Sequence, residues 1–156
     1  MERTIISNQQ ESISTMTDII YTHIFHPDNL PVGIKYENLD NIYKYADNTI
    51  EHLMITDLLD YHVDDECNKI INKISDKLAP KGQLQVQSTD LLQLMINLSN
   101  GTVDETMAKI ILYPHKKSIH SMYDIEQLLL KHNFSILNKR YINVFEYFIV
   151  AQKNEQ

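Results

Sequence analysis

Four polar residues follow a short apolar stretch near the middle of the chain, and their types could carry out proton transfer. They are Asp57, Asp60, Tyr61 and His62, which come directly after an expected strand at residues 51–56. A tyrosine or histidine at the carboxyl end of a strand can act as a general base where its pKa is tuned. The alternative is a solvated loop that leads into an acidic helix start at residues 64–66.

A second group of polar residues is expected near the carboxyl ends of other strands. Asn8, His26 and Asn38 could line a ligand cleft, because open α/β sheets bind ligands outside the carboxyl ends of their strands. The alternative is that these three are ordinary loop residues. Lys116 and Lys117 form a small basic cluster that either meets an anionic substrate or is simply solvated.

The histidines and the single cysteine form no known metal motif. His23 and His26, like His115 and His120, adjoin neither a cysteine pair nor an HExxH pattern, so we expect no metal. Cys67 lies in the first turn of an expected helix, whose dipole would lower a thiol pKa. No histidine is evident beside it in the sequence, and we expect a buried or idle thiol.

Composition and charge describe an ordinary globular domain. The 156 residues, 43% hydrophobic and 22% charged, suit a single domain over residues 1–156. A net charge of −7 argues against a nucleic-acid partner. No apolar stretch approaches the roughly 20 residues that span a bilayer, so no membrane association is expected. One cysteine fits a reducing cytoplasm, and the abundance of Ile, Asn, Lys and Tyr indicates an AT-rich genome, such as that of a virus.

Alternating strands and helices must position these residues. Apolar and β-branched residues predict strands at residues 3–7, 18–25, 32–39, 51–56, 82–88, 134–141 and 144–152. Apolar residues at three- and four-residue spacing predict helices at residues 64–78, 90–98, 103–112 and 121–131. The order predicts that the strands at 51–56 and 82–88 are parallel neighbours joined by the first helix, and that the last two strands pair antiparallel.

The middle of the chain resembles a known enzyme family. Residues 46–61 read as an acidic turn, an apolar strand and a loop, and residues 78–90 as a Leu-Ala-Pro-Lys-Gly turn before another strand. This order and spacing resemble the S-adenosylmethionine-dependent methyltransferases with a Rossmann-like sheet (methyltransferase type 11-like). The C-terminal third is similar as well, because Asn133-Phe134 stands where the family usually has Gly-Phe before two final strands.

The resemblance implies a fold and a set of cofactor residues. The fold is α/β, a Rossmann-like methyltransferase sheet of about seven strands with helices on both faces and a C-terminal antiparallel strand pair. The cofactor would be S-adenosylmethionine. The positions that fall on the family's cofactor motifs are Ser7, Asn8, Gln9, His26, Asn38, Asp47 and Glu51. In this family catalytic groups often follow the fourth strand, where Asp57, Asp60, Tyr61 and His62 stand.

The N-terminal cofactor motif departs from the family pattern. The family's glycine loop lets the backbone approach the cofactor, whereas Ser7-Asn8-Gln9 has no glycine, and Phe25 or His26 stands where a carboxylate normally binds the ribose. We therefore expect a methyltransferase-like binding or scaffold subunit with a degenerate cofactor site. The alternatives are an active methyltransferase with a divergent cofactor loop, or another small-ligand enzyme on the same fold. The apolar run from Leu91 to Leu98 is either core or the face for a protein partner or a homo-oligomer.

Overall fold

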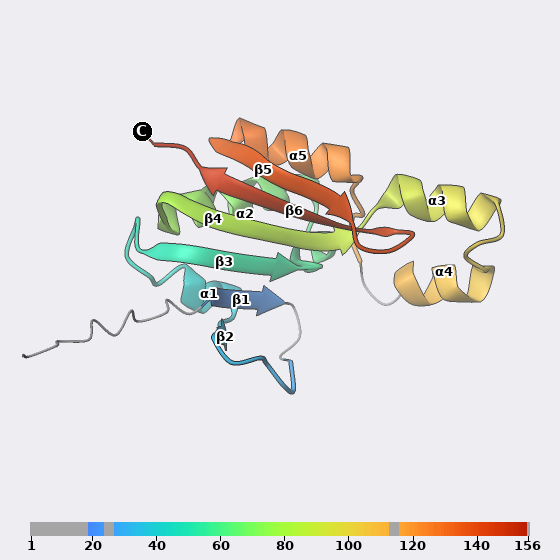
Figure 1. The fold of residues 1–156 in the computed structure, drawn as a ribbon, viewed down its shortest axis with the longest axis horizontal. Coiled ribbons are helices and arrows are strands. Elements are labelled where there is room, and N and C mark those ends of the chain that lie inside the picture. The colour runs from blue at the N-terminus through green and yellow to red at the C-terminus, as the bar shows by residue number, and fades with distance from the viewer. Residues whose placement is uncertain (1–18, 24–26, 113–115, 156) are drawn as a thin grey trace, which may run out of the picture.

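The computed structural model describes residues 19–23, 27–112 and 116–155. Their strands form one mixed six-stranded sheet in the order β2-β1-β3-β4-β6-β5 (Figure 1). The parallel strands are β1 (Ile19–His23), β2 (Ile34–Tyr36), β3 (Ile50–Thr56) and β4 (Leu78–Thr89). Strand β6 (Glu146–Lys153) pairs antiparallel with both β4 and β5 (Phe134–Tyr141).

The helices follow the apolar periodicity and the capping residues of the sequence. They are α1 (Leu39–Ile42), α2 (Asp64–Lys77), α3 (Leu91–Ser99), α4 (Glu105–Leu112), α5 (Met122–Lys131) and the short 3₁₀ helix η1 (Leu58–Tyr61). Ser121 begins α5, where its hydroxyl accepts from the Asp124 N–H at 3.1 Å while Asp124 accepts from the Ser121 N–H at 3.1 Å. Such reciprocal caps satisfy donors that a helix start leaves unpaired.

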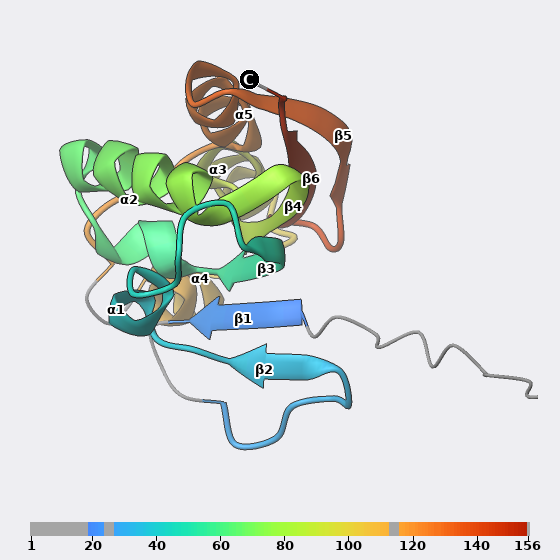
Figure 2. The ribbon, with the colours of Figure 1, turned by 90° about the vertical axis from the view of Figure 1, so that its left-hand side faces the viewer.

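One face of the sheet carries most of the core. A row of cross-strand neighbours on this face is fully buried: Thr22, Ile55, Val86 and Ile149. The next row, with side chains that point to the other face, is half-buried: Tyr21, Met54, Gln85 and Val150. Figure 2 shows α1, α2 and α5 on the same side of the sheet, so these helices cover the buried face.

Helices α3 and α4 extend beyond the carboxyl ends of β3 and β4 (Figure 1). They form a small core of their own around Leu94, Val103 and Ala108. Several of their apolar side chains are exposed: Leu92, Met95, Ile96, Leu98, Met107, Ile110 and Leu112. Exposed apolar side chains thus gather on these two short helices.

The α/β class, the parallel β3–β4 pair joined by α2 and the antiparallel β5–β6 pair are confirmed. The expected strand at residues 3–7 lies outside the described residues, which contain six strands rather than about seven. The described helices α1, α2 and α5 lie on one face, not both. Within the described ranges, no helix is long and apolar enough to cross a bilayer.

Candidate functional site at the carboxyl ends of the parallel strands

The order of the strands defines where a ligand would bind. The chain winds outward from β1 to β2 on one side and from β3 to β4 on the other. The connections therefore diverge between β1 and β3, and in open α/β sheets the ligand crevice lies outside the carboxyl ends at this switch point. His23 ends β1 and Thr56 ends β3, and the two residues are cross-strand neighbours.

A network of charges lies at the carboxyl ends of β3 and β4. The Lys116 ammonium donates to Asp60 Oδ2 at 2.8 Å and to Thr89 Oγ1 at 3.3 Å. The Ser88 hydroxyl lies 2.8 Å from Asp60 Oδ2 and 3.2 Å from Asp57 Oδ1. The Asp60 and Lys116 side chains are only 2% and 10% exposed, so the ion pair is part of the interior.

The two carboxylates of this network have pKa values shifted in opposite directions. Burial raises the pKa of Asp60 above its usual value, although the ion pair with Lys116 opposes this. Burial acts on Asp57 as well. Hydrogen bonding with His23, the charge of Lys116 and the Ser88 hydroxyl together outweigh it, and the pKa of Asp57 lies below its usual value. With its side chain 27% exposed against 2% for Asp60, Asp57 is also the more accessible of the two carboxylates.

A crevice of about 220 Å³ lies beside the network, at the carboxyl ends of β1 and β2. Its lining residues come from β1, β2, the start of α1 and the segment after β3: Thr22, His23, Tyr36, Asn38, Leu39, Asp40, Leu58 and His62. Thr22 is fully buried, and its hydroxyl has no hydrogen-bond partner among the described residues. An unpaired buried hydroxyl on the wall can bond a polar ligand.

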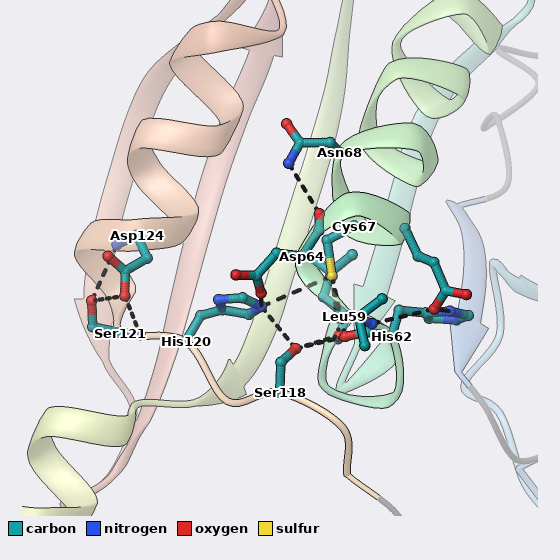
Figure 3. Close-up of polar contacts among 11 residues, drawn as sticks. Leu59, His62, Asp64, Cys67, Asn68, Ser118, His120, Ser121 and Asp124 are labelled. Atoms are coloured by element: carbon teal, nitrogen blue, oxygen red, sulfur yellow. Dashed lines mark hydrogen bonds and ion pairs between the residues drawn. The ribbon is translucent and has the colours of Figure 1, made fainter.

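A second polar cluster connects the segment before α5 to the start of α2, as Figure 3 shows. The Ser118 hydroxyl donates to the His62 carbonyl at 2.6 Å and lies 3.0 Å from His120 Nε2. His120 Nε2 is 3.9 Å from Cys67 Sγ and 3.8 Å from Asp64 Oδ1. The backbone N–H groups of Lys117 and Ser118 donate to the Asp60 carbonyl at 2.7 and 3.1 Å. These contacts hold the two segments together.

Cys67 has a histidine neighbour that the sequence did not reveal, but the thiol is not activated. It is 1% exposed and donates to the Leu59 carbonyl at 3.3 Å. Burial, followed by the charge of Asp64, raises its pKa to about 11, so it is a thiol rather than a thiolate at neutral pH. Within the described part of the chain, no three His, Cys, Asp or Glu side chains are arranged to hold a metal ion.

Of the four residues predicted for catalysis, Asp57 and Asp60 share the network. Tyr61 ends η1, and burial raises its pKa above its usual value, so its phenol stays protonated at neutral pH. His62 lines the crevice, and its Nδ1 lies 3.3 Å from Glu66 Oε2. Lys116, predicted to be either substrate-facing or solvated, is instead the buried partner of Asp60.

The residues predicted for the cofactor are more dispersed. Ser7, Asn8, Gln9 and His26 lie outside the described residues. Asn38 lines the crevice and caps α1, where its side chain accepts from the Asn41 N–H at 2.8 Å. Asp47 and Glu51 lie at the amino end of β3, about 20 Å from the switch point at the usual rise of a strand. Asp47 pairs there with Lys77 at 2.6 Å.

Sequence reasoning missed Glu37, which directly follows β2. An acid at the end of the second strand is where dinucleotide-binding sheets hydrogen-bond the ribose. The Glu37 carboxylate lies 2.6 Å from Lys35 Nζ and accepts from Asn41 Nδ2 at 3.1 Å and from the Tyr45 hydroxyl at 3.3 Å. The strand predicted at 32–39 placed Glu37 inside a strand, which concealed its position at the end of one.

Comparison with known proteins identifies the fold. No family model matches the sequence, and no curated protein matches it. A methyltransferase of Methanosarcina mazei is 14% identical, with a TM-score of 0.56 over 79% of this chain and 68% of that one. The magnesium protoporphyrin IX methyltransferase of Synechocystis, with bound SAH, is 15% identical, with a TM-score of 0.52 over 78% of this chain and 52% of that one.

A third similar structure is a complex. It joins the Haloferax volcanii Trm112 methyltransferase activator to a candidate methyltransferase, and the match is 8% identical, with a TM-score of 0.56 over 81% of this chain and 65% of that one. The chain thus spans about half to two thirds of the length of these structures. Likeness at such low identity shows the fold alone, and the chain has the fold of the S-adenosylmethionine-dependent methyltransferases.

Proposed function

We propose that the chain is a methyltransferase-like binding or scaffold subunit whose cofactor position does not accommodate S-adenosylmethionine. The observation that carries this is the connection between β1 and β2. It spans residues 24–33 only, and its described part, residues 27–33, contains no helix. Parallel strands are usually joined by a helical crossover of a dozen or more residues, and the start of that helix offers backbone N–H groups to an anionic group such as a carboxylate.

The same connection has no glycine where the cofactor would approach the backbone. Its single glycine is Gly33, at the entry to β2 rather than after β1. The adjoining crevice of about 220 Å³ is smaller than the roughly 300–1,000 Å³ of pockets that bind small molecules. Both features support a cofactor position that has been remodelled rather than retained.

An active methyltransferase is the second candidate, and Glu37 is the observation that favours it. Its carboxylate follows β2, in the position expected for ribose binding. Two observations weigh against this role. The carboxylate is already paired with Lys35 and accepts hydrogen bonds from Asn41 and Tyr45, and Glu37 does not line the crevice. Binding a ribose would require Glu37 to break these contacts.

A scaffold subunit needs a surface for its partner. The exposed apolar side chains of α3 and α4 supply one, and this helix pair stands apart from the main core. The Haloferax volcanii complex, in which an activator binds a candidate methyltransferase, is a precedent for a fold of this kind working beside another protein. We propose a protein partner or a second copy of the chain at this surface.

Denaturant unfolding with and without S-adenosylhomocysteine tests the proposal. A ligand at 100 times its dissociation constant raises the free energy of unfolding by about 2.7 kcal/mol, which a midpoint shift reveals. We expect no shift at roughly millimolar ligand, which is 100 times a dissociation constant of about 10 μM. A shift that Glu37→Ala abolishes would instead show that the cofactor binds through Glu37, and would favour the active methyltransferase.

A further inference from the structure

Lys153, the last residue of β6, is a buried cation. It lies at the end of the sheet that faces away from the crevice. Only 8% of the residue is exposed. Its ammonium donates to Asn48 Oδ1 at 2.8 Å and to the Leu78 carbonyl at 2.8 Å. Asn48 precedes β3 and Leu78 begins β4, so the lysine lies at the amino ends of these strands.

No acid among the described residues balances this charge. Lys116, the comparable buried lysine, has the Asp60 carboxylate at 2.8 Å. Lys153 has only a carbonyl and an amide oxygen, and no carboxylate of the described residues lies within 4.0 Å of its ammonium. Burying a charge without a counter-charge is costly. An ammonium also has three donors, of which these contacts use two.

A hollow of about 500 Å³ opens beside this ammonium, lined by Asn48, Pro80, Lys153, Asn154 and Glu155. The Asn48 side-chain oxygen faces Lys153, and none of the described residues accepts a hydrogen bond from its NH₂ group. The one acid in the lining, Glu155, already has the Lys81 ammonium at 2.9 Å. Among the described residues, the hollow thus brings together a buried ammonium that lacks a carboxylate partner and an amide NH₂ group that lacks an acceptor.

We propose that this hollow binds a small oxyanion, a carboxylate or phosphate group, through the third N–H of Lys153 and the Asn48 NH₂ group. The anion supplies the counter-charge that the surrounding side chains lack. Charge-assisted hydrogen bonds of this kind are the stronger class in proteins. The site lies away from the switch point, and its occupation does not depend on the proposed function.

Titration by ¹H–¹⁵N NMR with inorganic phosphate, and separately with acetate, at constant ionic strength tests the site. We expect saturable shifts of the amides of Asn48 and residues 153–155 with at least one anion. The anion that binds more tightly identifies the ligand as a phosphate or a carboxylate group. Asn48→Ala should weaken binding about tenfold or more, because it removes a donor to a charged group. Lys153→Met should abolish binding where it folds, and Lys109→Met, at an exposed ion pair on α4 away from the hollow, should leave binding unchanged.

The titrations distinguish binding in this hollow from other effects of the added anions. Shifts that do not saturate with either anion, or binding that Asn48→Ala leaves intact, would overturn the proposal. Binding that Lys109→Met weakens as much as Asn48→Ala does would also overturn it, because the effect would then come from the overall charge of the protein and not from this hollow. Asn48→Ala leaves Lys153 and its bond to Leu78 in place, so the test stands even where Lys153→Met does not fold.

Discussion

At the scale of single residues, the carboxyl ends of the parallel strands satisfy their own charges. Lys116 is bound to Asp60, and Ser88 lies within reach of both Asp57 and Asp60. A catalytic network usually keeps a tuned group available to substrate. Here the most buried carboxylate is already paired inside the protein, and this fits a structural role better than proton transfer.

Removing Lys116 should therefore expose the cost of the buried carboxylate. Lys116→Met leaves Asp60 without its counter-charge and should lower the free energy of unfolding by about 3–5 kcal/mol. The double variant Lys116→Met/Asp60→Asn should recover part of the lost free energy of unfolding, because it no longer has a buried charge without a partner. Lys117→Met, at an exposed neighbour, should change it by about 0.5 kcal/mol or less. Urea unfolding at neutral pH measures the free energy of unfolding of each variant. Equal effects of the two lysine variants would contradict the assignment.

The lowered pKa of Asp57 predicts a pH dependence. The unfolded carboxyl has a pKa of about 3.9, above that of the folded state, so the unfolded chain binds more protons as the pH falls. The stabilisation from Asp57 is present above this value and is lost as the pH falls through the folded pKa. The stability difference between the wild-type protein and Asp57→Asn should hold above about pH 5 and shrink at lower pH. A difference that stays constant into strong acid would contradict it.

At the scale of elements, Asp90 connects three parts of the fold. Its Oδ1 accepts from the Gln93 N–H at 2.9 Å in the first turn of α3. Its Oδ2 accepts from the Met122 N–H at 2.8 Å at the start of α5 and from the Tyr141 hydroxyl at 3.1 Å at the end of β5. Asp90 is 2% exposed, so water cannot replace these bonds readily.

Asp90→Ala should therefore destabilise the protein more than the loss of an ordinary helix cap. We expect a loss of about 2–3 kcal/mol in the free energy of unfolding, because one cap and two further charged hydrogen bonds disappear. Asp104→Ala is the matched control, since Asp104 is exposed and its carboxylate accepts, among the described residues, from the Met107 N–H alone, at 2.7 Å. It should cost about 1 kcal/mol. Equal losses would show that Asp90 is only a cap.

Most elements could be predicted because their signals are local. Helix α2 combines an acidic start with apolar residues at helical spacing, and β4 alternates Leu84 and Val86 with glutamines. The start of β4 at Leu78 was missed because Pro80 and Gly82 are typical of a turn. Asp57 and Asp60 could be proposed from their place after β3. Ser88 and Lys116 could not, because they reach the site from 28 and 56 residues beyond Asp60.

At the scale of the whole molecule, the protein has two unequal cores. The main core lies between the sheet and α1, α2 and α5, whereas Leu94, Val103 and Ala108 form a small one between α3 and α4. Elements with few buried apolar contacts open at lower free energy than the global unfolding reaction. The α3–α4 pair should therefore open independently of the sheet.

Native-state hydrogen exchange should show this difference. We expect the amides of α3 and α4 to exchange with a lower opening free energy than those of β3, β4 and α2, because the second core buries so little. A bound partner at α3 and α4 should raise their protection. Equal protection of both regions in the isolated chain would mean that the two cores unfold as one.

We propose that the remodelled β1–β2 connection leaves no working site for S-adenosylmethionine. Isothermal titration calorimetry of the full chain with S-adenosylmethionine and with S-adenosylhomocysteine tests this most directly. We expect no measurable binding, or a dissociation constant far weaker than micromolar, which corresponds to less than about 8 kcal/mol of binding free energy. A dissociation constant of micromolar order or tighter for either compound would contradict it.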